Sequence, residues 1–184
     1  DPRYGDRTNM EIYDADGKGI EGVYRIDPDG SVSLVITHEV DRPNGIGISR
    51  DGKYLVVADN MNSGLNDGVG GNRKLWRFDL KADGSVDPDS RKLLFDWGTE
   101  RGPDGLVVGP GGNLYVTAGF NFPSLPAETA DKHPAGVYVF DLEGKLLRLI
   151  PVPEDMITNC TFGGEDGKTL FITAGHKLWS LPIE

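Results

Sequence analysis

The sequence predicts an all-β protein, a β-propeller of four-stranded blades, and three observations lead to that fold class. Glycine is abundant, with 26 Gly and 12 Pro among 184 residues, and the glycines recur at turn-like places between short apolar runs. No long stretch shows the 3.6-residue periodicity of an amphipathic helix. A pattern of about 50 residues also occurs three times, as expected of propeller blades.

The repeats set the expected strands. They occupy Gly22–Asp59, Lys74–Gly119 and Gly136–Gly175, and Lys177–Ile183 repeats only the opening strand. Each repeat begins with an aromatic-bearing strand and a hairpin at an Asp-Gly or Glu-Gly turn. A short inner strand and a near-continuous apolar strand follow. The aromatic residues Trp76, Tyr138 and Trp179 are expected to pack between blades.

The number of repeats predicts an incomplete ring, because propellers close with about four to eight blades. We expect residues 1–184 to form a single, partial β-propeller domain of about three and a half blades, with the N-terminal blades absent. Exposed sheet edges are a liability in solution. The alternatives are therefore missing upstream sequence or a second chain that completes the propeller.

Charge and composition exclude several classes of partner. Asp and Glu number 29 against 19 Lys and Arg, a net charge of −10, which argues against nucleic-acid or anionic-membrane surfaces. No run approaches the roughly 20 apolar residues of a membrane span, and no signal peptide is visible. The location, cytoplasmic or exported, stays open. A single cysteine, Cys160, excludes an internal disulfide and a cysteine-based zinc cluster. It is expected to be a buried, inert thiol rather than a nucleophile.

Two insertions interrupt the repeats at similar positions. Met61–Arg73 is rich in Gly and Asn, and Phe120–His133 contains more Pro and aromatic residues. Both follow the last strand of a repeat. They either overhang one mouth of the channel or are surface loops without chemistry.

An amide or a carboxylate precedes each inner strand. Asn44 lies in Pro-Asn-Gly, Asp104 in Pro-Asp-Gly and Asn159 in Thr-Asn-Cys, with spacings that match the repeat. Equivalent positions of a propeller face one axis, so these three side chains are expected to converge. Oxygen ligands suit a hard cation such as Ca²⁺ or Mg²⁺. The alternative is that Asn and Asp at turns bond the local backbone.

These motifs carry a family resemblance. The stretches RPNGIGISRDGKYLVVAD, GPDGLVVGPGGNLYVTAG and TNCTFGGEDGKTLFITA, with the opening DPRYG, resemble the senescence-marker-protein/gluconolactonase (regucalcin-like) family of six-bladed propeller lactonases. The resemblance covers nearly the whole chain except the two insertions. It places this chain in the C-terminal part of an expected six-bladed ring.

The resemblance implies a divalent-metal site and its residues. Asn44 and Asp104 match metal ligands of the family, and Asp104 also matches its catalytic acid/base. Asn159 matches a residue at the substrate pocket, and Asp1, in a looser alignment, another pocket residue. The implied cofactor is one divalent cation, Ca²⁺ in first place, with Mg²⁺, Mn²⁺ and Zn²⁺ as alternatives. The family's third ligand, a Glu of the first blade, has no match here.

The implied activity is metal-dependent hydrolysis of a sugar lactone. The cation would polarise the lactone carbonyl, and Asp104 would take a proton from the attacking water and return it to the ring oxygen. Two alternatives remain. One is a phosphotriesterase-type hydrolase on the same propeller. The other is a propeller without catalysis that binds calcium or a protein partner.

Overall fold

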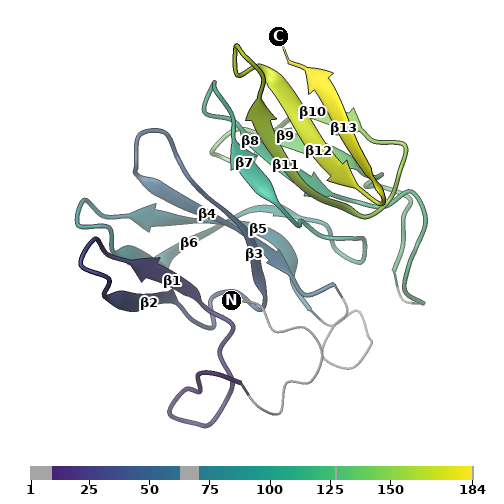
Figure 1. Ribbon diagram of the computed structural model, residues 1–184. Coiled ribbons are helices and arrows are strands. Elements are labelled where there is room, and N and C mark those ends of the chain that lie inside the picture. The colour runs from purple at the N-terminus through teal and green to yellow at the C-terminus, as the bar shows by residue number, and fades with distance from the viewer. Residues whose placement is uncertain (1–9, 63–70, 127, 184) are drawn as a thin grey trace.

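The computed structural model describes residues 10–62, 71–126 and 128–183, and this part of the chain is all β (Figure 1). Among the described residues, no helix is long and apolar enough to span a bilayer. The strands are β1 (Val23–Ile26), β2 (Val32–Ile36), β3 (Pro43–Ile48), β4 (Tyr54–Asn60), β5 (Arg73–Leu80), β6 (Val86–Asp96), β7 (Leu106–Val108), β8 (Leu114–Ala118), β9 (Gly136–Phe140), β10 (Leu146–Pro151), β11 (Ile157–Gly163), β12 (Thr169–Ala174) and β13 (Lys177–Pro182).

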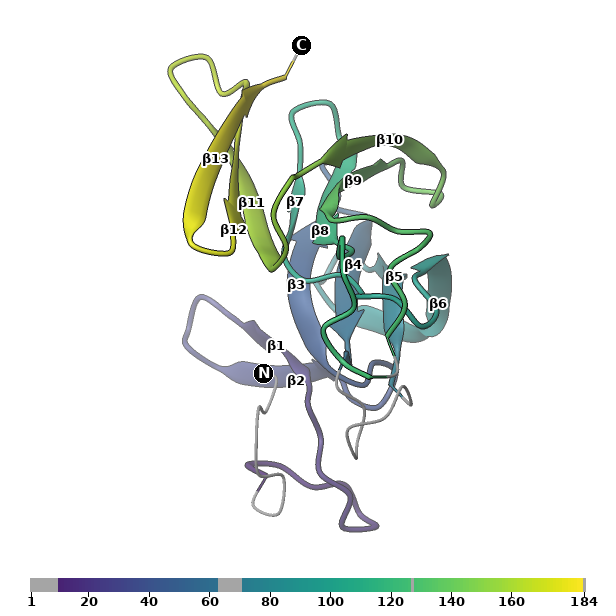
Figure 2. The same ribbon diagram turned by 90° about the vertical axis from the view of Figure 1, so that its right-hand side faces the viewer.

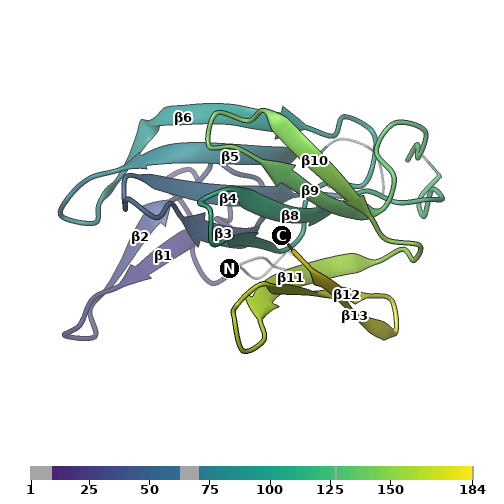
Figure 3. The same cartoon turned by 90° about the horizontal axis from the view of Figure 1, so that it is seen from above.

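The strands form four antiparallel sheets. Their orders are β1–β2, β3–β4–β5–β6, β7–β8–β9–β10 and β11–β12–β13. The inner strands are neighbours across the sheets, because β7 contacts both β3 and β11. Figures 2 and 3 show the sheets set side by side, with their outer strands diverging. This arrangement confirms the predicted partial propeller.

The blades begin at a different strand from the sequence repeats. The repeat Gly22–Asp59 supplies β1 and β2 to one sheet and β3 and β4 to the next. The reason is that β2 pairs with β1 and with no other strand in the described part of the chain. The chain then crosses to β3, an inner strand that pairs with β4. Each repeat as read from the sequence therefore joins the outer half of one blade to the inner half of its neighbour.

The cores lie between adjacent sheets, and the middle strands serve two of them. In β4, Leu55 and Val57 face the β1–β2 hairpin, whereas Val56 and Ala58 face the sheet of β7–β10. All four side chains are at most 5% exposed. Because successive residues of a strand point to opposite faces, a strand buried on both faces must be apolar throughout. This explains the near-continuous apolar run that the sequence shows here.

Aromatic side chains fill the central core. Trp97 lies edge-on to Phe95, with ring centroids 4.7 Å apart, and edge-on to Tyr138 at 5.7 Å. Tyr138 is 1% exposed and Trp76 is 8% exposed, while Trp179 is partly buried against the core of the last sheet. The prediction that the repeated aromatic residues pack between blades is therefore confirmed.

An ion cluster ties the outer strands of two blades together. Glu143, in the β9–β10 turn, accepts a hydrogen bond from Arg77 Nη1 on β5 at 2.6 Å and pairs with Lys92 on β6. Arg77 Nη1 also donates to the Leu142 carbonyl at 2.6 Å. Hydrogen bonds from Lys92 and Arg77 lower the pKa of Glu143 to about 2.

This cluster predicts a contribution to acid stability. Glu143 ionises more readily in the folded protein than its ordinary pKa of 4.5, so its contribution is complete above pH 4.5 and disappears as the pH falls towards about 2. Glu143→Gln is expected to flatten the change in melting temperature over that range, measured by circular dichroism. The control is Glu165→Gln, an exposed glutamate of the β11–β12 turn. Parallel curves for Glu143→Gln and wild type would contradict the prediction.

Candidate functional site

A β-bulge positions the first motif at the start of β3. The register of β3 against β4 shifts between Pro43 and Ile46, which leaves Asn44 and Gly45 together opposite a single residue of β4. A bulge kinks its strand and re-aims the side chain that it carries, and such bulges are frequent beside active sites. Asn44 is thereby turned out of the regular alternation of β3.

The same bulge recurs in the next blade. The Asp104 N–H donates to the carbonyl of Thr117 at 2.8 Å, and the Thr117 N–H donates to the carbonyl of Gly105 at 3.0 Å. Asp104 and Gly105 therefore lie opposite a single residue, Thr117, just as Asn44 and Gly45 lie opposite a single residue of β4. In β11 the register shifts next to Thr158.

The register corrects one expectation about the third motif. The carbonyl of Asp104 accepts a hydrogen bond from the Gly45 N–H at 2.9 Å, and the carbonyl of Thr158 accepts one from the Gly105 N–H at 2.8 Å. Thr158 is thus the equivalent of Asp104, and Asn159 is the equivalent of the glycine that follows it. The expected equivalence of Asn159 with Asn44 and Asp104 is wrong by one residue, because counting from one motif to the next does not locate the bulge.

The glycines of the motifs are required by the close approach of the inner strands. A Cβ on Gly45 would lie 2.5 Å from the Asp104 carbonyl oxygen, and one on Gly105 would lie 2.4 Å from Asn159 Oδ1. Any side chain at these positions would push neighbouring blades apart. Gly45 and Gly105 therefore set the spacing between neighbouring blades and bring the backbones of the three motifs together.

Substitution of these glycines is expected to cost stability. Gly45→Ala and Gly105→Ala should each destabilise the fold by about 1–3 kcal/mol, because the added methyl group overlaps atoms of the next blade. Gly111→Ala is the matched control, since a Cβ there meets nothing within 4 Å. It should change stability by less than about 1 kcal/mol. Urea unfolding of the three variants measures the effect, and equal stabilities would refute the close-approach argument.

Asp104 is a partly buried carboxylate that lies beside Asn44. Burial raises the pKa of Asp104 above its ordinary value, while the charge of Arg101 and a hydrogen bond with the Asn44 side chain act in the opposite direction. The structure thus brings Asn44 and Asp104 into direct contact, as expected. A desolvated carboxyl group at the meeting point of three inner strands makes Asp104 a candidate functional residue.

Asn159 lies next to this pair but faces a groove. Its Oδ1 accepts the backbone N–H of Cys160 at 2.9 Å, and its side chain is exposed. The groove has a volume of about 410 Å³ and is lined by Leu106, Val107, Asn159, Cys160, Thr161, Phe171, Thr173 and Leu178. Asp1, the other expected pocket residue, lies outside the described residues.

The donor set at the centre fits a hard cation. Among residues 10–62, 71–126 and 128–183, no three His, Cys, Asp or Glu side chains gather to hold a metal. The Asn44 and Asp104 side chains are in contact, and the amide and carboxylate groups that they carry supply oxygen donors of the kind that suit Ca²⁺ or Mg²⁺. The residues present are therefore compatible with part of the coordination shell of a divalent cation.

Asp59 holds the segment that leads to Asn44, a role that sequence reasoning missed. Its carboxylate is fully buried and accepts the backbone N–H of Arg42 at 2.9 Å, the N–H of Asp41 at 3.1 Å and Trp76 Nε1 at 3.1 Å. Burial raises the pKa of Asp59. One signal was available, because the first repeat ends in Ala-Asp where the other two end in Ala-Gly.

A second buried carboxylate, Glu100, holds the insertion Phe120–His133. It is 2% exposed and accepts the backbone N–H groups of Lys132 at 2.8 Å and Asp131 at 3.1 Å. His133 Nδ1 lies 2.8 Å from its Oε2. The insertion leaves β8 at the end of the blade where Asp104 lies, because the Gly119 N–H donates to the Arg101 carbonyl at 3.0 Å.

Cys160 is buried within the last core, as expected. It is 5% exposed, its Sγ lies 3.6 Å from the Tyr115 carbonyl oxygen, and burial raises its pKa to about 12. Because the thiolate is the reactive form, this position favours an inert thiol.

This burial gives a direct test by thiol modification. At about pH 8, Ellman's reagent should leave Cys160 unmodified in the folded protein and modify it fully in denaturant, since an ordinary thiol has a pKa of about 8.5. Prompt modification of the folded protein would show that the thiol is accessible and ionised.

Comparison with known proteins places the chain in a family. Residues 7–176 match the model of the SMP-30/Gluconolactonase/LRE-like region. The chain belongs to this family. It is 34% identical to a gluconolactonase of Zymomonas mobilis over 186 aligned positions, which cover 97% of this chain and 44% of that protein. The resemblance that the sequence motifs indicated is thus confirmed.

Solved structures of the family share the fold. The structure matches a gluconolactonase from Xanthomonas campestris with a TM-score of 0.66 and 32% identity, over 89% of this chain and 44% of that one. A calcium-binding protein, regucalcin, from Agrobacterium tumefaciens matches with a TM-score of 0.63 and 20% identity, over 85% of this chain and 45% of that one. The chain spans less than half the length of these relatives.

Proposed function

We propose that this protein hydrolyses a sugar lactone with the help of a divalent cation, with Asp104 as the acid/base. The observation that carries the proposal is the partly buried carboxyl group of Asp104, in contact with Asn44 where three inner strands meet. The similarity to proteins named gluconolactonase supports it.

Two residues of this chain would hold the cation. The favoured cation is Ca²⁺, and Mg²⁺, Mn²⁺ and Zn²⁺ are the alternatives. The two residues are Asn44, through its amide oxygen, and Asp104, through its carboxylate. When bound, the cation supplies Lewis-acid polarisation of the lactone carbonyl. The similarity to a calcium-binding regucalcin supports the choice of metal.

The proton transfers fall to Asp104. Its carboxylate accepts a proton from the attacking water and returns it to the ring oxygen as the ester bond breaks. A pKa raised by burial suits this double role, because the group must release the proton as readily as it takes it. We assign contacts with the sugar to Asn159, which lies beside Gly105, and to Asp1.

The central test is Asp104→Asn, which keeps the size of the side chain but removes its base. Hydrolysis of glucono-δ-lactone at neutral pH is measured with Ca²⁺ and with EDTA, and corrected for spontaneous ring opening. We expect a rate that depends on the cation and falls by about 10²–10⁴ in the variant. The control is Asp89→Asn, an exposed aspartate on β6 that should keep the wild-type rate.

The same assay separates the alternatives. An Asp104→Asn protein that keeps the wild-type rate contradicts the acid/base role. Turnover of a phosphotriester without turnover of a lactone would indicate the phosphotriesterase-type reaction. Binding of Ca²⁺ without any turnover would indicate a propeller that only binds calcium or a partner.

A further inference from the structure

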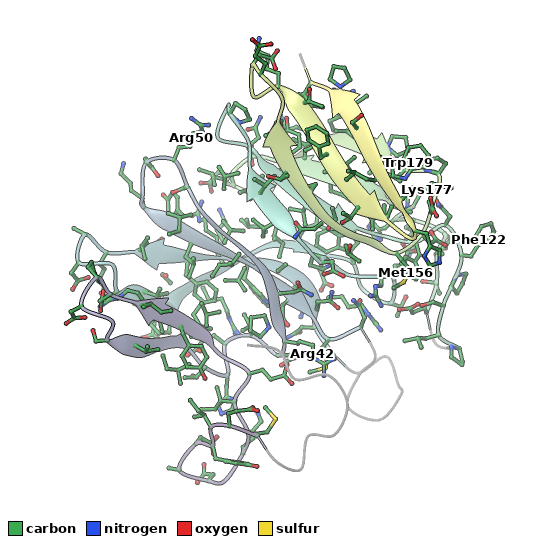
Figure 4. All side chains as sticks on the ribbon, viewed as in Figure 1. Arg42, Arg50, Phe122, Met156, Lys177 and Trp179 are labelled. Carbon is green, nitrogen blue, oxygen red and sulfur yellow. The ribbon has the colours of Figure 1, made fainter. Side chains whose placement is uncertain are left out.

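Three residues occupy the same position in successive blades, just before the motifs. The carbonyl of each accepts a hydrogen bond from the end of the neighbouring strand, and the pairs are Arg42 with the Asn60 N–H at 2.9 Å, Arg101 with the Gly119 N–H at 3.0 Å, and Met156 with the Gly175 N–H at 3.1 Å. Figure 4 shows Arg42 and Met156 at the end of the blades where the motifs lie, and Arg50 at the other end.

Arg42 is a structural member of this set. Its side chain is 6% exposed, and its Nε donates to Glu21 Oε2 at 3.2 Å, while the Glu21 side chain is fully buried. The positive charge of Arg42 is therefore neutralised within the fold. Buried charges are normally paired in this way.

Arg101 is equivalent to Arg42 in backbone position but not in partners. Its guanidinium group makes no hydrogen bond or ion pair with any residue that the structure describes, although it is only partly exposed. Its Cζ lies 5.1 Å from the centre of the Phe120 ring, which orients the guanidinium plane. It is three residues from Asp104, and its charge acts on that carboxyl group.

Arg73 is a second arginine with free donors near Arg101. It is 1% exposed, and one nitrogen, Nη2, donates to the Asn62 carbonyl, but Nε and Nη1 have no hydrogen-bond partner in the described part of the chain. Desolvation lowers the pKa of Arg73, the charge of Arg101 lowers it further, and the carboxylate of Glu128 acts in the opposite direction.

Free guanidinium donors in a desolvated place favour an anionic partner. Leaving buried donors unpaired is costly, and two neighbouring positive charges repel. The planar fork of a guanidinium group matches the paired oxygens of a carboxylate or a phosphate. One carboxylate, Glu128, is near Arg73 and offsets part of its charge. Its Oε2 accepts hydrogen bonds from Ser124 and Leu125, and its Oε1 is buried without a partner among the described residues, so it does not satisfy the free Arg73 donors.

We propose that Arg101, backed by Arg73, binds an anionic group of the substrate, so that the preferred substrates are sugar lactones that carry a carboxylate or a phosphate. This inference rests on the proposed lactone hydrolysis and names its substrate class. Arg101 acts as a specificity-determining residue, because it contacts the substrate away from the ester bond that breaks.

The kinetic test compares charged and neutral lactones on the Ca²⁺-loaded protein. The substrates are glucaro-1,4-lactone, with a carboxylate, 6-phosphoglucono-δ-lactone, with a phosphate, and neutral glucono-δ-lactone. For wild type, kcat/KM should be higher for at least one charged lactone than for the neutral lactone. The charged lactone with the higher kcat/KM shows whether the site prefers a carboxylate or a phosphate. Arg101→Gln should lower the charged-to-neutral ratio of kcat/KM at least tenfold, and Arg101→Lys, which keeps the charge but loses the fork, should lower it less. Arg50→Gln, at the opposite end of the blade, should leave the ratio unchanged.

A binding measurement separates failure of this inference from failure of the proposed function. Inorganic phosphate is titrated calorimetrically into the protein in EDTA, which requires no turnover. Wild type and Arg50→Gln should bind phosphate, and Arg101→Gln should bind it at least tenfold more weakly. If no lactone is hydrolysed but this difference is found, the lactonase proposal fails and the anion site stands. Equal phosphate binding by Arg101→Gln and wild type, or a charged-to-neutral ratio unchanged in Arg101→Gln, overturns the anion site.

Discussion

The contact between neighbouring inner strands is the constraint on which the rest of the structure depends. Backbone hydrogen bonds join Gly45 to Asp104 and Gly105 to Thr158, and they form only because a glycine lets two blades approach at these points. The residues that make these contacts belong to the motifs, so the packing of the blades also determines where the motif side chains lie. A protein that packs these blades correctly has already placed Asn44 against Asp104.

Much of the fold followed from the sequence because its signals were local. Asp-Gly turns specify hairpins, and the apolar run at Leu55–Ala58 specifies a strand buried on both faces. The repeat period also located Asn44 and Asp104 at one site. The repeat period placed Asn159 one residue away from its true equivalent position, because the extra residue of a bulge shows only in the pairing with the next strand.

The partners of charged side chains were beyond the reach of sequence reasoning. Arg42 and Arg101 stand before similar motifs, yet the first is paired with Glu21 and the second with no described residue. In the sequence, Glu100 is an ordinary acidic residue and Asp59 differs only in standing where the other repeats have Gly. Each is buried and accepts backbone N–H groups of a loop. Such roles depend on which segment of the chain the fold brings near the side chain. A buried carboxylate needs hydrogen-bond donors, and the backbone of the adjacent loop supplies them.

The cores shared between adjacent sheets have a consequence for how the molecule opens. Each sheet buries its faces only against its immediate neighbours, so coupling decays along the row of sheets, as in other repeat architectures. Local opening should therefore begin in a flanking sheet, while β4, buried on both faces by Leu55–Ala58, should exchange its amide hydrogens last. Asn44 and Asp104 belong to the two four-stranded sheets in the middle of that row. The contact between Asn44 and Asp104 would thus be among the last parts of the protein to lose its shape, and partial opening of the flanking sheets need not disrupt it.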